Sequence, residues 1–128
     1  MEPTIGNRGA DPRYQPLLDE LTAATPGLRG VIISTADGLV ISHRLPDGID
    51  PLNFAAMVAT LGGVAESTCE ELALGRSRRS QLEGDAGQLL VAPLSNELVA
   101  GLLIEPGTTP ETAHDQLQAH RDRLLAVA

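Results

Sequence analysis

The dipeptide Asp37-Gly38 lies between two apolar segments rich in β-branched residues, and it constrains the fold more than any other feature of the chain. An Asp-Gly pair in such a setting is the strongest short-range indication of a β-hairpin. We therefore expect strands over residues 28–34 and 39–44. Both faces of these strands carry apolar side chains, so we expect other elements to cover the hairpin on both sides.

Helical and strand patterns alternate along the rest of the chain and predict an α+β protein. The expected order is helix, two strands, helix, three strands, helix. The helices are expected over residues 13–25 and 50–74 and from 109 onward, and the further strands over 76–83, 88–93 and 97–104.

The length of 128 residues is typical of a single domain. Residues 1–12 are rich in Gly, Pro and polar side chains, so we expect them to form a disordered tail. The folded domain is then expected over residues 13–128.

The charge of the chain argues against several classes of partner, and its cysteine content indicates the compartment. The formal net charge of −8 argues against binding to nucleic acid, which needs clustered cations, and against adsorption to an anionic membrane. No apolar run of about 18 residues is present, so we expect no direct membrane insertion. All nine cationic residues are arginines, which is typical of a GC-rich bacterial genome. A single cysteine fits a reducing cytoplasm.

The sequence offers no convincing catalytic, cofactor or metal site. It has no nucleophile motif, and a chain without lysine cannot supply the lysine of a phosphate-binding loop. His43, His114 and His120 lack the spacing of metal ligands, and Cys69 is expected to pack as a small apolar residue. We expect no catalytic, cofactor-binding or metal-binding residues, and therefore a recognition module that is not an enzyme.

The central helix carries two adjacent kinds of face. One has a spacing of three and four that we expect to face the sheet, and it comprises Val58, Leu61, Ala65, Thr68 and Leu72. The other consists of small residues, namely Ala55, Ala56, Ala59, Gly62, Gly63 and Ser67. Two adjacent glycines inside a helix each cost roughly 1 kcal/mol relative to Ala, so a close approach by another element is expected there.

The segment after this helix is strongly polar and includes Arg76, Arg78 and Ser80. Charges on an exposed strand edge often serve only to prevent aggregation. Alternatively, a partner strand pairs with this edge, and these residues form with the small face of the helix a self-complementary patch for a two-fold dimer. Glu66, Glu70 and Glu71 either form a solvated face or pair with these arginines.

The ordered pattern from about Tyr14 to Val127 resembles the roadblock family of dynein light chains, in particular its bacterial members. The segments that carry the resemblance are 18–21, 26–34, 36–42, 54–61 and 87–94. The resemblance implies a five-stranded antiparallel sheet with helices on both faces. It also implies a homodimer formed through the central helix and the third strand.

Bacterial members such as the gliding-motility B regulators and the roadblock proteins of signalling operons bind a small Ras-like GTPase. The resemblance therefore implies a non-catalytic regulator or scaffold that modulates the nucleotide cycle or location of such a GTPase. The alternative from the sequence is a ligand-sensing or general assembly adaptor module, which an apolar pocket would favour.

Overall fold

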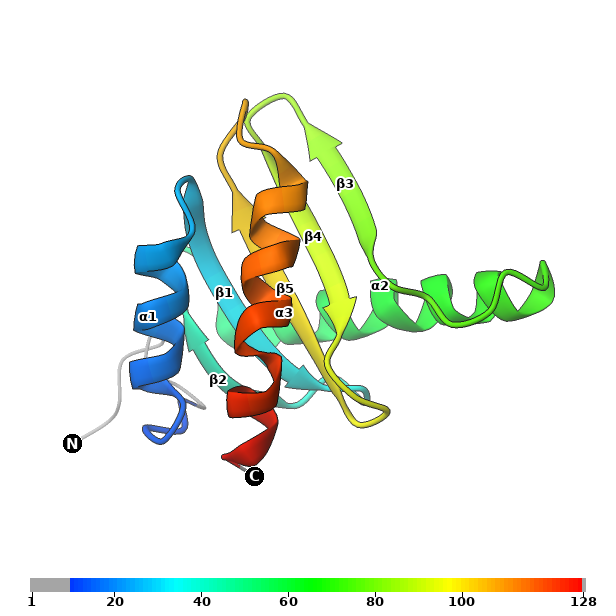
Figure 1. Cartoon of the computed structure of the whole chain (residues 1–128), viewed down its shortest axis with the longest axis horizontal. Coiled ribbons are helices and arrows are strands. Elements are labelled where there is room, and N and C mark those ends of the chain that lie inside the picture. The colour runs from blue at the N-terminus through cyan, green and yellow to red at the C-terminus, as the bar shows by residue number, and fades with distance from the viewer. Residues whose placement is uncertain (1–9, 128) are drawn as a thin grey trace.

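A five-stranded antiparallel sheet, with one helix on one face and two on the other, makes up the computed structural model of the chain (Figure 1). The structure describes residues 10–127. The elements are α1 (Gln15–Ala24), β1 (Leu28–Thr35), β2 (Val40–Arg44), α2 (Pro51–Glu71), β3 (Ser80–Gly84), β4 (Gly87–Pro93), β5 (Leu98–Ile104) and α3 (Pro110–Ala126). Their order and the antiparallel sheet confirm the fold expected from the sequence.

The predicted hairpin is the β1–β2 pair, which turns at Gly38 with a φ of 93°. Within the turn the N–H of Thr35 donates to the carbonyl of Leu39, and the N–H of Gly38 donates to the carbonyl of Thr35. The strands lie in the order β2-β1-β5-β4-β3, so β2 and β3 form the two edges of the sheet.

Two apolar cores lie on opposite faces of the sheet. Val31 and Ile33 of β1 pack with α1 and α3, whereas Ile32 between them packs with α2. The alternation of buried side chains along β1 explains why the sequence is apolar on both faces of the hairpin. In α3 the expected inward face is confirmed, since Ala113, Leu117, His120 and Leu124 are buried.

The helix α2 begins as predicted, because the Asp50 carboxylate accepts a hydrogen bond from the N–H of Leu52 and Pro51 occupies the first turn. Its first half packs on the sheet, and its second half extends past β3 (Figure 1). The expectation that its whole face from Val58 to Leu72 contacts the sheet is therefore wrong for the second half. Val58 is fully buried, but Leu72 is 62% exposed.

The C-terminus of α2 also differs from the expectation. We expected the helix to continue to Leu74, with Gly75 ending it, but it ends at Glu71. Ala73 adopts a left-handed φ of 56°, and the N–H of Leu74 donates to the carbonyl of Cys69 at 2.8 Å. This is the closing pattern that a glycine usually supplies, formed here by an alanine.

The third strand is shorter than its polar sequence suggested. It begins at Ser80 instead of Arg76, so Arg76 and Arg78 lie in the loop that leads to it. Residues 10–12, expected to belong to a disordered tail, are ordered along β2, and the rest of that expected tail, residues 1–9, lies outside the described residues.

Candidate interaction surface

The two edges of the sheet differ in whether their backbone groups are already paired. On β2, the N–H of Asp11 donates to the carbonyl of Ile41 at 3.0 Å. The side-chain amide of Gln15 donates to the carbonyl of His43 at 3.1 Å and to the hydroxyl of Ser42 at 2.9 Å. The segment before α1 thus occupies the outer edge of β2 and blocks strand addition there.

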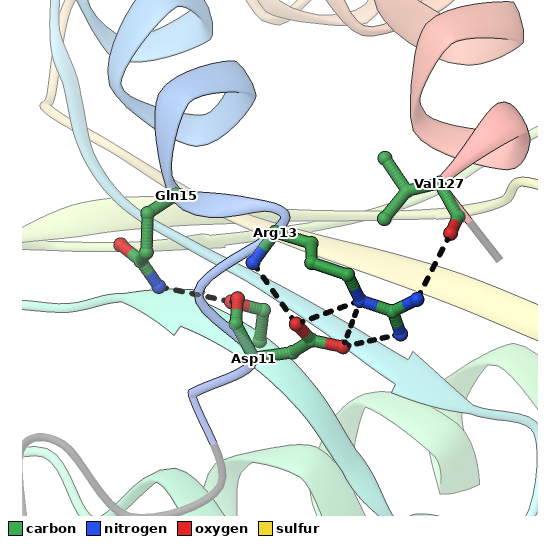
Figure 2. Close-up of polar contacts among 5 residues, drawn as sticks. Asp11, Arg13, Gln15 and Val127 are labelled. Atoms are coloured by element: carbon green, nitrogen blue, oxygen red, sulfur yellow. Dashed lines mark hydrogen bonds and ion pairs between the residues drawn. The ribbon is translucent and has the colours of Figure 1, made fainter.

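Figure 2 shows how this segment is held. The Arg13 guanidinium donates from Nη2 to Asp11 Oδ2 at 2.8 Å and from Nη1 to the carbonyl of Val127 at 3.4 Å. The hydrogen bond from the Arg13 side chain holds the pKa of the Asp11 carboxyl below its usual value. The same arginine therefore ties the N-terminal segment to the C-terminal end of α3, where the helix dipole favours a cation.

The opposite edge, β3, is open. Within residues 10–127, no other segment donates to or accepts from the outer backbone edge of Ser80–Gly84. Four of its five residues, Gln81 to Gly84, are exposed, and Leu82 is an apolar residue with 53% of its surface accessible. An exposed strand edge with an apolar side chain is a template for pairing with another chain.

An apolar stripe on α2 lies beside this open edge. Met57 and Val64 are 47% and 60% exposed, whereas Leu61 of the same stripe is half-buried against the sheet. Next to the stripe, the part of the sheet that α2 leaves uncovered forms a shallow hollow of about 220 Å³ bordered by Leu82, Leu89 and Leu103, among other residues. The helix and the sheet together present a concave apolar surface that a second helix could fill.

Charge is divided between the two ends of β3. Arg78 and Arg79 precede the strand, and Glu83 and Asp85 lie at its far end. Arg79 also forms an ion pair with Glu111 of α3, and the hydrogen bond from Arg79 lowers the pKa of that carboxyl. His114, one turn further along α3, has a lowered pKa because it is partly buried and because Arg79 is close to it.

Of the small residues predicted to form the dimer interface, Ala56 lines one hollow together with Met57 and Leu61 of the stripe, and the others lie elsewhere. Ala55 is fully buried in the protomer, and a Cβ on Gly62 would lie 3.4 Å from Val99 Cγ2. Ala59 and Gly63 line a separate cleft, described below, on the other side of the helix. Ala56 and Ser67 are exposed, Arg76 and Arg78 lie in the loop, and Ser80 begins β3.

Sequence reasoning missed Met57 and Val64 as surface residues. They occur at helical spacing next to the predicted inward face, so their spacing was a usable signal. The spacing could not show that α2 extends past the edge of its own sheet.

Among residues 10–127, no three His, Cys, Asp or Glu side chains come together in a way that could hold a metal ion. Of the helices in that range, none is both long and apolar enough to cross a bilayer.

Solved structures with the same fold are found in several bacteria. The chain is similar to a gliding protein, MglB, from Thermus thermophilus, with a TM-score of 0.79 and 19% identity over 100% of this chain and 98% of that chain. It is also similar to a Roadblock/LC7 domain from Streptomyces avermitilis, with a TM-score of 0.75 and 19% identity over 85% of this chain and 95% of that one.

A curated relative is closer in sequence but matches only in part. An uncharacterized protein of Methanocaldococcus jannaschii is 34% identical over 67 residues, which are 52% of this chain and 59% of that protein. The chain thus spans less than two thirds of the length of this relative. A family model described as the Roadblock/LC7 domain matches residues 14–104, from the start of α1 to the end of β5. The chain therefore belongs to the Roadblock/LC7 domain family.

Proposed function

We propose that this chain is a homodimeric, non-catalytic regulator or scaffold for a small Ras-like GTPase. The observation that carries the proposal is the unpaired edge of β3 beside an exposed apolar stripe, in a member of the Roadblock/LC7 family. A solved MglB, with a TM-score of 0.80 and 17% identity, is described with a tetrameric arrangement, which supports self-association of this fold.

The charges around β3 favour an antiparallel pairing of two copies. In that arrangement the start of one strand lies beside the end of the other. Arg78 and Arg79 of one copy then approach Glu83 and Asp85 of the second, whereas a parallel arrangement would place like charges together. A two-fold axis repeats each favourable contact, so the pairing is self-complementary.

The stripe on α2 has the same symmetry. At the same helical spacing, Thr68 and Leu72 continue the stripe of Met57, Leu61 and Val64 toward the end of the helix. Because the spacing is nearly symmetric about Val64, an antiparallel copy of the helix would place Val64 beside its own counterpart and Leu72 beside Met57. The half of α2 that extends past β3 would then cover the hollow on the sheet of the second copy. The proposed interface thus accounts for apolar residues that one protomer leaves exposed.

Charge reversal tests this pairing. Arg78→Glu and Glu83→Arg each place like charges across the two-fold axis. A surface ion pair contributes about 1 kcal/mol, so each pair that is lost is expected to raise the dissociation constant of the dimer about fivefold. The double variant restores opposite charges and is expected to recover the dimer. Sedimentation equilibrium measures the dissociation constants, with Asp122→Arg, a similar charge change on exposed α3, as the control.

If the double variant is as weak as the two single variants together, the antiparallel contact is wrong. A chain that sediments as a single copy at every concentration would overturn the dimer itself.

The GTPase is proposed on the family resemblance, supported by a surface suited to binding protein. A regulator of this kind acts by positioning groups of the GTPase, so it needs no catalytic residues of its own. The test is calorimetry with a small Ras-like GTPase from the same organism, loaded with GDP or with a GTP analogue, together with measurement of its hydrolysis rate. We expect binding that differs between the two nucleotide states. Absence of binding in both states, with no change in hydrolysis, would reject the proposed partner.

A further inference from the structure

A cleft of about 210 Å³ lies on the side of α2 opposite the apolar stripe. Successive helix residues are about 100° apart, so Ala59 and Gly63 point away from Met57 and Val64. The cleft is bounded by this side of α2, by the turn between β4 and β5 and by the loop that leads to β3. Apart from Ser80, which begins β3, its lining residues lie outside the surface proposed for the dimer.

The interior of the cleft is apolar because small residues leave space above the sheet. Val91, Leu98 and Val99 are among the residues that line it from the sheet. On the helix, Ala59 adds only a methyl group, and a Cβ placed on Gly63 would meet no atom within 4 Å. The pair of adjacent glycines thus coincides with a hollow, and a larger side chain at either Ala59 or Gly63 would project into or over it.

Arg76 spans the mouth of this cleft. Its Nε donates to Glu66 Oε1 of α2 at 2.6 Å, and its Nη2 donates to Asn96 Oδ1 of the β4–β5 turn at 2.8 Å. The N–H of Ser77 donates to the other oxygen of Glu66 at 3.2 Å. The Arg76 side chain is 70% exposed, so this bridge lies on the solvent side of the cleft and can swing outward into water.

We propose that this cleft binds a small, uncharged, mainly apolar ring compound with a single hydrogen-bonding group. A dry cavity of about 150 Å³ lined by apolar side chains is large enough for benzene, so the present volume suits about six to nine non-hydrogen atoms. The interior offers no charged partner, and Arg76 and Glu66 neutralise each other, so a charged ligand would lose its hydration without compensation. Ser77 and Ser80 at the rim can satisfy one polar group of the ligand.

Indole serves as the probe because it has this size, no charge and one N–H group. The full-length, ¹⁵N-labelled chain is titrated with indole, and amide shifts are followed by NMR. We expect saturable shifts at Ala59, Gly63, Ser77 and Asn96. Benzoate, which adds a charge to a similar ring, is expected to produce none. Saturable shifts that centre on Met57 and Leu61, or no saturable shift up to the solubility limit of indole, would overturn the site.

A filling substitution tests the cleft itself. Ala59→Leu places additional carbon atoms inside it and is expected to abolish indole binding, whereas Ala119→Leu on exposed α3 adds the same atoms elsewhere and should leave binding unchanged. Arg76→Met removes the bridge and is expected to speed indole dissociation. Unchanged binding by Ala59→Leu would overturn the proposal.

The filling variant also separates this inference from the proposed dimer. If Ala59→Leu loses indole binding and keeps the molar mass of the unaltered chain by light scattering, the cleft is supported. If it loses both, Ala59 belongs to the interface between copies, and the cleft is not a ligand site. Neither result depends on whether a GTPase binds.

Discussion

The backbone N–H of Asp11 lies 3.0 Å from the carbonyl oxygen of Ile41, so the outer edge of β2 is already paired within the chain. The other edge, β3, has no such cover among the described residues. This asymmetry leaves one edge for strand addition, which would limit the proposed assembly to closed pairs of copies, since a sheet with two open edges would grow without limit.

Loss of the side-chain hydrogen bonds that hold the segment before α1 against β2 should open the outer edge of β2. Gln15→Ala removes the donor to His43 and Ser42, and we expect a loss of about 1 kcal/mol in the free energy of unfolding. Species larger than the unaltered protein should also form at high concentration. Urea unfolding and light scattering check the two effects. Gln118→Ala, an exposed glutamine of α3, is the control, and the same assembly size for both variants would show that the β2 edge needs no protection.

The left-handed alanine at the end of α2 is a site for stabilisation. Ala73 has a φ of 56°, a conformation that costs about 1–2 kcal/mol for a residue with a Cβ and little for glycine. Ala73→Gly is therefore expected to raise the free energy of unfolding by about 0.5–1 kcal/mol. Ala119→Gly inside α3 should lower it by about 1 kcal/mol. If Ala73→Gly destabilises the chain as Ala119→Gly does, the helix does not end in this conformation.

Gly101 of β5 lies where Val58 of α2 packs tightly on the sheet. A Cβ at this position would lie 2.5 Å from Val58 Cγ2 and 3.1 Å from Ile32 Cγ2. Gly101→Ala is expected to cost about 1–3 kcal/mol, because neither buried neighbour can move freely. Gly63→Ala meets open space and adds a better helix former, so it should stabilise α2 by up to about 1 kcal/mol. Thermal unfolding measures the stability of the two variants, and equal changes in stability for both would contradict the packing of α2 on β5.

His114 should make stability depend on pH in a defined direction. Partial burial, together with nearby Arg79, lowers its pKa in the folded state, so the unfolded chain binds the proton more readily. The folded state is therefore expected to lose stability as the pH falls below the usual histidine range, and to lose none on this account at higher pH. Between about pH 8 and pH 5, His114→Gln should lose less stability than the unaltered chain, measured by urea unfolding. Parallel losses would show that His114 is not the group responsible.

Local rules predicted the elements of the fold well. The Asp37-Gly38 turn, the Asp50 cap and the inward face of α3 all follow from short-range patterns, and the structure has each of them. The predicted strand began too early, at Arg76, because the polar residues 76–79 directly precede the residues that do form β3. Whether they pair depends on β4, which pairs with Ser80 but not with Arg76.

The candidate surface was predicted only in part. The sequence indicated α2 and the third strand, but it could not show that α2 extends past its own sheet, since that depends on where the helix crosses the strands. The small residues predicted to form the interface have different surroundings in one protomer: Ala55 and Gly62 pack within it, and Ala59 and Gly63 border a cleft. Their place in an interface stays a prediction.

Two copies of the chain are proposed to meet along α2 and β3. Val64→Cys, made with Cys69→Ser to remove the native thiol, places one cysteine near the proposed two-fold axis. Disulfides form only when the two Cβ atoms can lie within about 4.5 Å. Under mild oxidation, we predict that the 13.4 kDa chain becomes a covalent dimer in high yield, whereas Ala23→Cys on exposed α1 does not. Equal, low yields for both variants would contradict the proposed interface.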